Sequence, residues 1–265
     1  MASYEINFFS ASLKRCVPFR AFIPNDQLSQ WIEYNPNYKR ETKTLFLLHG
    51  YMGNDVDWGF NSLAAELSTT YNLAIIMPSG ENSFYLNAEA TGHKYEDYVG
   101  TELPEYVHRV FGLSAKPSDN YICGLSMGGF GAIHTALAHP ETFGKMMGLS
   151  SALICDGLNG MKDGDDNGMA NYAYYEYWFG PLDKIDESHN NPKFLVKERL
   201  TKGEKIQPVY IAIGTEDFLI EPNRNFKAFL DEKKVEVTYV EDKGVHDWKF
   251  WNKYLEPAIK WALEI

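Results

Sequence analysis

Short runs of consecutive apolar residues recur along most of the chain, and nearly all are followed by a segment with helical periodicity. Six runs have the length of a strand: Thr44 to Leu48, Leu73 to Met77, Tyr121 to Gly124, Met146 to Ser150, Val209 to Ile213 and Val235 to Val240. Helical patterns cover Asn61 to Thr70, Tyr95 to Phe111, Met127 to Ala138, Asn223 to Lys233 and Trp248 to Leu263. Because strands buried on both faces are apolar throughout, this alternation predicts an α/β fold with a mostly parallel sheet and helices on both faces.

Three segments depart from the alternation. Tyr4 to Ser10 and Cys16 to Ile23 flank a polar turn and predict an N-terminal antiparallel hairpin, which a polar connection from Pro24 to Thr42 follows. Residues from about 155 to 204 begin with a Gly/Asp/Asn-rich stretch and continue into an aromatic run, and they predict a lid-like insertion. Gly100 and Pro104 predict a bend or break in the second helix. We expect one domain, 1–265, that carries this insertion.

Composition and charge argue against a nucleic-acid-binding, a membrane-spanning and a secreted protein. The chain has 265 residues, of which 45% are hydrophobic, so it is long enough to bury a sizeable core. Acidic residues outnumber basic ones by 36 to 25, and the net charge of −11 argues against a nucleic-acid partner. No apolar run approaches the roughly 18 residues of a membrane span, and no secretory signal pattern is visible. We therefore expect a cytoplasmic protein whose three cysteines are free thiols.

The strongest chemical signal is the sequence Gly124-Leu125-Ser126-Met127-Gly128-Gly129. It lies between a strand run and an alanine-rich helical pattern, which is the setting of a nucleophile elbow. Glycines at 124 and 128 permit the sharp turn that exposes the Ser126 hydroxyl. The alternative is a small-residue turn in which Ser126 only caps the helix.

A serine hydroxyl needs a base to remove its proton, and the base needs an orienting carboxylate. In this type of fold the expected chain order is Ser, then Asp or Glu, then His. His246 follows the last strand run and precedes the C-terminal helix, so we predict that it is the general base. Asp217 lies in the loop after Val209 to Ile213, and we predict that it orients His246.

A serine hydrolase also needs two N–H donors for the oxyanion of its tetrahedral intermediate. The Met127 N–H follows the nucleophile and is one predicted donor. The other is the Tyr51 N–H, because the loop His49-Gly50-Tyr51-Met52-Gly53 follows the first parallel strand run.

These motifs together resemble the esterase D-like branch of α/β hydrolases. The resemblance rests on His49-Gly50-x-x-Gly53 with Trp58, the Ser126 elbow, Gly214-Thr215-Glu216-Asp217 and His246-Asp247-Trp248, and it covers nearly the whole chain. That branch holds S-formylglutathione hydrolases, tributyrin esterases, and feruloyl and acetylxylan esterases. It implies the α/β-hydrolase fold and hydrolysis of a small-molecule ester through an acyl-enzyme on Ser126, without a cofactor or metal. Some members of the branch form dimers or tetramers, so a homo-oligomer is compatible with it.

The predicted activity is a serine carboxylesterase for short acyl or phenolic acyl groups, such as acetyl esters of carbohydrates. S-formylglutathione hydrolases carry Ser-Gly-Leu where this chain has His49-Gly50-Tyr51, a difference that favours the tributyrin-type and carbohydrate-deacylating members. Alternatives are an S-formylglutathione hydrolase or other thioesterase, an acyltransferase, and a non-catalytic binding protein on a hydrolase scaffold, which would predict a missing member of the Ser-Asp-His set.

Four aromatic residues are candidates for substrate binding: Trp58, Trp248, Tyr175 and Trp178. Packing in the core or at a subunit interface is the alternative for each. Asp163 to Gly168 matches the first half of a calcium loop, but Tyr174 stands where a bidentate glutamate is needed. We therefore interpret that segment as an acidic loop that binds no metal.

Overall fold

An eight-stranded, mostly parallel sheet forms the centre of the molecule. The computed structural model describes residues 1–88 and 91–265. The sheet order is β1-β2-β4-β3-β7-β8-β9-β10, in which only the pairs β1/β2 and β2/β4 are antiparallel. The strands are β1 (Ala2–Ser10), β2 (Arg15–Ile23), β3 (Lys43–Leu48), β4 (Leu73–Pro78), β7 (Asn120–Leu125), β8 (Lys145–Leu149), β9 (Val209–Gly214) and β10 (Val237–Asp242). The predicted fold class, including the N-terminal hairpin, is confirmed.

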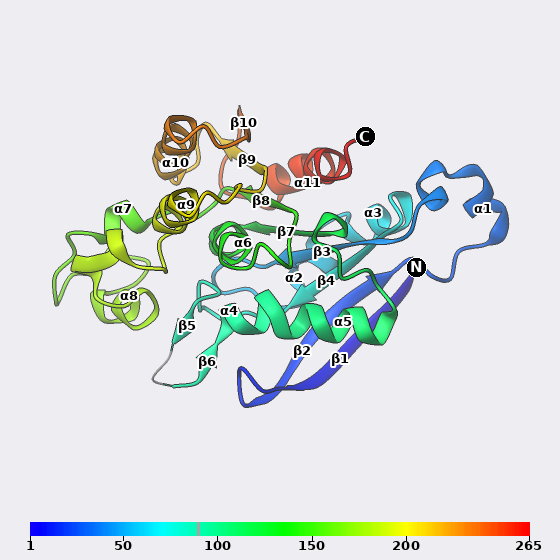
Figure 1. The fold of residues 1–265 in the computed structure, drawn as a ribbon, viewed down its shortest axis with the longest axis horizontal. Helices are drawn as coiled ribbons and strands as arrows, with labels where there is room; N and C mark the ends of the chain where they lie inside the picture. The colour runs from blue at the N-terminus through cyan, green and yellow to red at the C-terminus, as the bar shows by residue number, and fades with distance from the viewer. Residues whose placement is uncertain (89–90) are drawn as a thin grey trace.

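Alternate residues of the strands enter two separate cores, as the period of two in a strand requires. Phe46 and Leu48 of β3 face one core, whereas Leu45 and Leu47 face the other. The first core is covered by α5 (Leu103–Phe111), α6 (Met127–Ala138), α9 (Pro192–Thr201) and α10 (Ile220–Glu232). The second is covered by α2 (Asp57–Asn61), α3 (Ala64–Thr70) and α11 (Trp248–Leu263). The central strands of the sheet are therefore buried on both faces (Figure 1), whereas alternate residues of the edge strand β1 are exposed.

Local structure departs from the predicted elements at several places. The helix expected over Tyr95 to Phe111 is interrupted: α4 (Tyr95–Asp97) is followed by a π-helical turn, Tyr98–Glu102, and α5 begins at Leu103. Pro104 lies in the first turn of α5 and has no N–H for the Gly100 carbonyl four residues earlier, which accepts from the Thr142 hydroxyl at 2.9 Å instead. The helix expected from Asn61 begins at Ala64, because Ser62 is extended.

Short elements that the sequence pattern did not predict complete the chain. The polar connection after the hairpin contains α1 (Ser29–Tyr34) and a 3-10 turn, Pro36–Lys39. A small hairpin, β5 (Asn87–Ala88) with β6 (His93–Lys94), precedes α4, and a 3-10 turn, Pro117–Asp119, precedes β7. Between β8 and α9 lie α7 (Cys155–Leu158), α8 (Tyr172–Phe179) and a 3-10 turn, Leu182–Glu187. Figure 1 shows α7, α8 and α9 gathered at one side of the molecule and α1 at the other.

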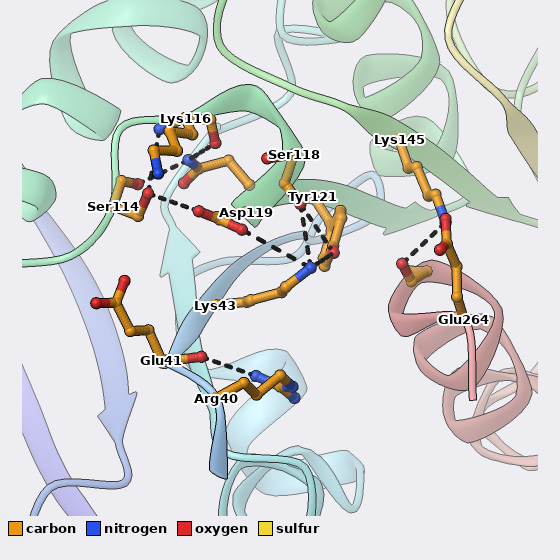
Figure 2. A network of polar contacts seen from close by, with 12 residues as sticks. Arg40, Glu41, Lys43, Ser114, Lys116, Ser118, Asp119, Tyr121, Lys145 and Glu264 are labelled. Carbon is orange, nitrogen blue, oxygen red and sulfur yellow. Dashed lines mark hydrogen bonds and ion pairs between the residues drawn. The ribbon is translucent and has the colours of Figure 1, made fainter. Parts of the chain in front are cut away.

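Two groups of polar contacts lie at the amino ends of the central strands (Figure 2). Lys43, at the start of β3, donates to the Tyr121 hydroxyl at 2.8 Å and lies 3.7 Å from Asp119. Lys145, at the start of β8, donates to the Ala262 carbonyl at the end of α11 at 3.0 Å. These contacts hold the strand ends that lie opposite the loops described next, which follow the carboxyl ends of β3, β7, β9 and β10.

Candidate active site

Ser126 occupies a strained turn between β7 and α6. Its φ of 54° and ψ of −119° are an unusual combination for a residue with a side chain. The turn is held by β8, because the Ser126 N–H donates to the Leu149 carbonyl at 2.9 Å and the Ser126 carbonyl accepts from the Ala152 N–H at 2.9 Å. A Cβ on Gly128 would lie 2.3 Å from the Leu48 carbonyl oxygen, so only glycine lets α6 approach β3 this closely.

Ser126, His246 and Asp217 form a continuous hydrogen-bonded series. The His246 Nε2 lies 3.0 Å from the Ser126 Oγ, and its Nδ1 lies 2.9 Å from the Asp217 Oδ2. Ser126 is 120 residues from His246 in the chain, and the loops after β7, β9 and β10 bring the three together. The predicted nucleophile, base and orienting carboxylate thus lie in the arrangement of a serine-hydrolase triad.

Asp217 is ionised within the fold although the residue is only 2% exposed. Burial alone would raise the pKa of its carboxyl, but hydrogen bonds from His246 and from the Leu219 N–H outweigh that effect and lower the pKa below its ordinary value. An ionised carboxylate at this position keeps a proton on the His246 Nδ1. The Nε2 is then free to accept the Ser126 proton.

The imidazole of His246 contacts two aromatic rings. Trp251 of α11 meets it edge-on at 5.1 Å between ring centroids and donates from its Nε1 to the Ser150 Oγ at 3.1 Å. Phe218 also contacts the imidazole, at 4.6 Å between ring centroids. Asp247 caps α11 by accepting the Phe250 N–H at 2.9 Å, which places His246 just before the helix.

The Tyr51 and Met127 N–H groups are available beside Ser126. Within the described residues, neither N–H donates to a protein acceptor, and both residues line the same cavity as Ser126. The two peptide groups that flank Tyr51 are held in place. The His49 Nδ1 contacts the Gly50 carbonyl at 2.7 Å, and the Met52 N–H donates to the Asn82 Oδ1 at 2.7 Å.

His49 holds the backbone of the loop after β3, a role that no motif in the sequence indicated. Its Nε2 accepts the Gly80 N–H at 2.8 Å, so the Nδ1 carries the proton and donates to the Gly50 carbonyl. Burial lowers the pKa of His49 to about 4, which keeps the ring neutral near pH 7. Because a trans peptide is planar, a fixed Gly50 carbonyl also fixes the opposite direction of the Tyr51 N–H.

A cavity of about 500 Å³ opens onto Ser126. Its walls are mostly apolar, and among the described residues no charged side chain lines it. The lining residues are Tyr51, Phe84, Ser126, Met127, Ala152, Ile154, Asn167, Gly168, Met169, Tyr175, Phe218 and Leu219. The segment between β8 and β9 therefore supplies one wall of the cavity.

Of the four aromatic candidates for substrate binding, Tyr175 lines the cavity and the three tryptophans do not. Trp58 is 1% exposed and donates to the Leu48 carbonyl at 3.0 Å, so it packs beneath the loop that follows β3. Trp248 packs edge-on against Trp58 at 5.1 Å, and Trp178 packs against Tyr95 in the core. Trp58 and Trp178 are buried and fill the interior, whereas Trp248 is half-buried, and substrate binding by these three residues stays a prediction.

Other residues of the cavity wall carried no sequence signal. Phe84, Ile154 and Met169 are ordinary apolar residues that only the tertiary structure brings to Ser126. In the Asp163 to Gly168 stretch, Asp165 and Asp166 accept N–H groups of their own loop. Within residues 1–88 and 91–265, no three His, Cys, Asp or Glu side chains are grouped so as to hold a metal ion. No helix of these residues is both long and apolar enough to cross a membrane.

The sheet topology, the elbow and the Ser-His-Asp geometry define a serine hydrolase with the α/β-hydrolase fold. The model of the Esterase family matches residues 10–262, and the chain belongs to that family. An acetyl esterase from Caldicellulosiruptor saccharolyticus is 38% identical over 265 residues, which cover all of this chain and 99% of that protein. The protein is a carboxylic ester hydrolase.

Two solved structures from Staphylococcus aureus are similar over 98% of both chains. One is the fluorophosphonate-binding serine hydrolase FphF, with 28% identity and a TM-score of 0.83. The other is the S-formylglutathione hydrolase FrmB, with 29% identity and a TM-score of 0.82.

Proposed function

We propose that the protein hydrolyses small carboxylic esters with short acyl or phenolic acyl groups through an acyl-enzyme on Ser126. The observation that carries the proposal is the uncharged, mostly apolar cavity of about 500 Å³ that opens onto this hydroxyl. Ligand pockets of this size hold small molecules. The acetyl esterase that is 38% identical over the whole chain supports acetyl as an acyl group.

The proposed mechanism has two half-reactions, and in each of them His246 acts first as a base and then as an acid. The Ser126 Oγ attacks the ester carbonyl while the His246 Nε2 takes its proton. The Tyr51 and Met127 N–H groups then donate to the oxyanion, a contribution of about 3 kcal/mol per donor. His246 returns the proton to the leaving alcohol, which departs and leaves Ser126 acylated. A water molecule, deprotonated by His246, releases the acid by the same steps.

S-formylglutathione hydrolysis is the second candidate, because FrmB is similar over nearly its whole length. Glutathione carries carboxylates, which proteins bind with Arg or Lys side chains. The described part of the cavity wall contains neither. This difference favours a neutral ester over the glutathione thioester.

A hydrolysis panel tests the proposal. It contains p-nitrophenyl acetate, butyrate and octanoate, methyl ferulate, acetylated xylo-oligosaccharide and S-formylglutathione. We expect acetate, butyrate or ferulate to have the highest kcat/KM, and Ser126→Ala to lose about 10⁴-fold or more of the rate with an unchanged circular dichroism spectrum. Dominant turnover of S-formylglutathione would contradict the substrate class, and an active Ser126→Ala enzyme would contradict the mechanism.

We also propose a single domain, 1–265, that works in the cytoplasm. The free thiols of Cys16, Cys123 and Cys155 support a reducing compartment, where disulfides are rare. Fractionation of the source cells, followed by detection of the protein, tests this location.

A further inference from the structure

Phe218 has a large aromatic side chain that is exposed to solvent at the mouth of the cavity. It is 65% exposed, although it directly follows the buried Asp217. The backbone around it is held firmly, because the Leu219 N–H donates to the Asp217 Oδ1 at 2.9 Å and the Ile220 N–H donates to the Asp217 carbonyl at 3.1 Å. The ring is therefore presented to the cavity by a fixed turn.

Holding His246 does not require Phe218. Trp251 is 7% exposed, packs against the imidazole and is anchored through its hydrogen bond to Ser150. Asp217 fixes the imidazole through the Nδ1. The contact between Phe218 and His246, 4.6 Å between ring centroids, leaves most of the phenyl surface free for another group.

The proposed mechanism determines which half of the substrate reaches this ring. His246 gives its Nε2 proton to the leaving oxygen, so that oxygen lies within hydrogen-bond distance of the imidazole. The acyl carbonyl oxygen lies instead at the Tyr51 and Met127 N–H groups. The substituent on the leaving oxygen is consequently the part that lies beside His246 and Phe218.

We propose that Phe218 determines specificity for the alcohol half of the ester, by packing against an alcohol that carries a ring with an apolar face. An aryl ring and a pyranose ring share this chemistry. Burial of the open phenyl ring against such a face is favourable, and the uncharged wall around it offers no ion pair to an anionic alcohol. This proposal rests on the proposed esterase function.

The test compares esters with one acyl group and different alcohols: benzyl acetate, an acetylated methyl xyloside and ethyl acetate. For Phe218→Ala we expect the ratio of kcat/KM between a ring-bearing ester and ethyl acetate to fall about 5- to 10-fold. A fall for benzyl acetate identifies an aryl alcohol, and a fall for the xyloside identifies a sugar. Phe218→Trp should retain the ratio. Unchanged ratios for both ring-bearing esters in Phe218→Ala would overturn the proposal.

Phe9→Ala is the matched control, because Phe9 of β1 is also 65% exposed but does not line the cavity. It should keep the wild-type ratios, and a fall equal to that in Phe218→Ala would overturn the proposal.

Stopped-flow kinetics with p-nitrophenyl acetate distinguish this role from a structural one. The alcohol is present during the fast acylation phase and has left before the slow deacylation phase. Phe218→Ala should slow the fast phase several-fold more than the slow phase. Equal slowing of both phases would show that Phe218 only positions His246, and would overturn the proposal.

Different results would contradict the proposed esterase function and the proposed role of Phe218. A wild-type protein that hydrolyses none of the esters overturns both, whereas an active wild type with unchanged ratios in Phe218→Ala overturns only the specificity proposal.

Discussion

At the scale of single residues, His49 shows how a buried side chain sets the direction of a backbone donor. Its ring is 1% exposed and bridges the Gly80 N–H and the Gly50 carbonyl. Only the neutral ring can accept from Gly80 and donate to Gly50 at the same time. The geometry beside Ser126 thus depends on the protonation state of a residue that does not touch the cavity.

The protonation of His49 predicts a loss of stability in acid. The pKa of His49 is about 4 in the folded protein, below the ordinary value of 6.5. As pH falls from 6.5 toward 4, the unfolded chain takes up a proton that folded His49 does not. The free energy of unfolding should therefore fall by up to about 3 kcal/mol over this window from this residue. Above pH 6.5 the effect is absent.

Urea unfolding at about pH 7 and about pH 4.5 measures this dependence. His49→Gln, which has no titratable group, should show a smaller difference between the two conditions. An identical difference in both proteins would contradict the assignment to His49.

At the scale of elements, α8 is connected to the loop after β3. The Tyr174 hydroxyl donates to the Asn82 carbonyl, and the Asn82 Oδ1 accepts the Met52 N–H at 2.7 Å. The Tyr174 ring also packs edge-on against Tyr51 at 5.9 Å. The segment between β8 and β9 therefore supports the Tyr51–Met52 peptide, which directly follows the peptide that carries a proposed oxyanion donor.

Removal of the Tyr174 hydroxyl should reduce catalysis more than binding. Tyr174→Phe keeps the ring contact with Tyr51 and loses the hydrogen bond to Asn82, a loss of about 1 kcal/mol. We expect kcat with p-nitrophenyl acetate to fall about 5- to 10-fold with little change in KM. Tyr172→Phe is the control on the same helix, since the Tyr172 hydroxyl contacts Glu176 at the surface. Equal effects of the two substitutions would argue against the connection.

At the scale of the whole molecule, Arg199 joins α9 to the body of the fold. It is 7% exposed and donates to the Leu137 carbonyl at 3.2 Å and to the Gln207 Oε1 at 2.7 Å. Gln207 in turn donates to the Ala136 carbonyl at 2.8 Å. Together the two side chains satisfy two of the last carbonyls of α6, the helix that directly follows Ser126.

Loss of the Arg199 guanidinium should destabilise the entire protein. Arg199→Met retains apolar volume but leaves buried carbonyls without donors, at a cost of about 2 to 4 kcal/mol. A chain of this size should then melt about 5 to 10 °C lower. Calorimetry of the variant measures the shift, with Arg109→Met on α5 as a surface control. A melting temperature equal to that of the wild type would show that water replaces the lost donors.

Periodicity, glycine placement and chain order were sufficient to predict the α/β fold and the elbow, and to select Ser126, Asp217 and His246, which the structure brings into hydrogen-bond contact. Their catalytic roles stay a proposal. These features are local: a strand run, a helical pattern and a Gly-x-Ser-x-Gly turn each depend on neighbouring residues. The α11 helix has the predicted bounds of Trp248 and Leu263 because its cap, Asp247, is adjacent in the sequence.

The cavity, the support of the oxyanion loop and the open face of Phe218 were decided only by the tertiary structure. Each depends on contacts between residues far apart in the chain, such as Tyr174 with Asn82 across 92 positions. Trp58 and Trp178 resemble binding residues in the sequence, but packing against distant elements buries them in the core. A local pattern does not show which distant side chains will pack over a residue. Such packing buries Trp58 and Trp178 in the core and leaves the Phe218 ring exposed at the active site.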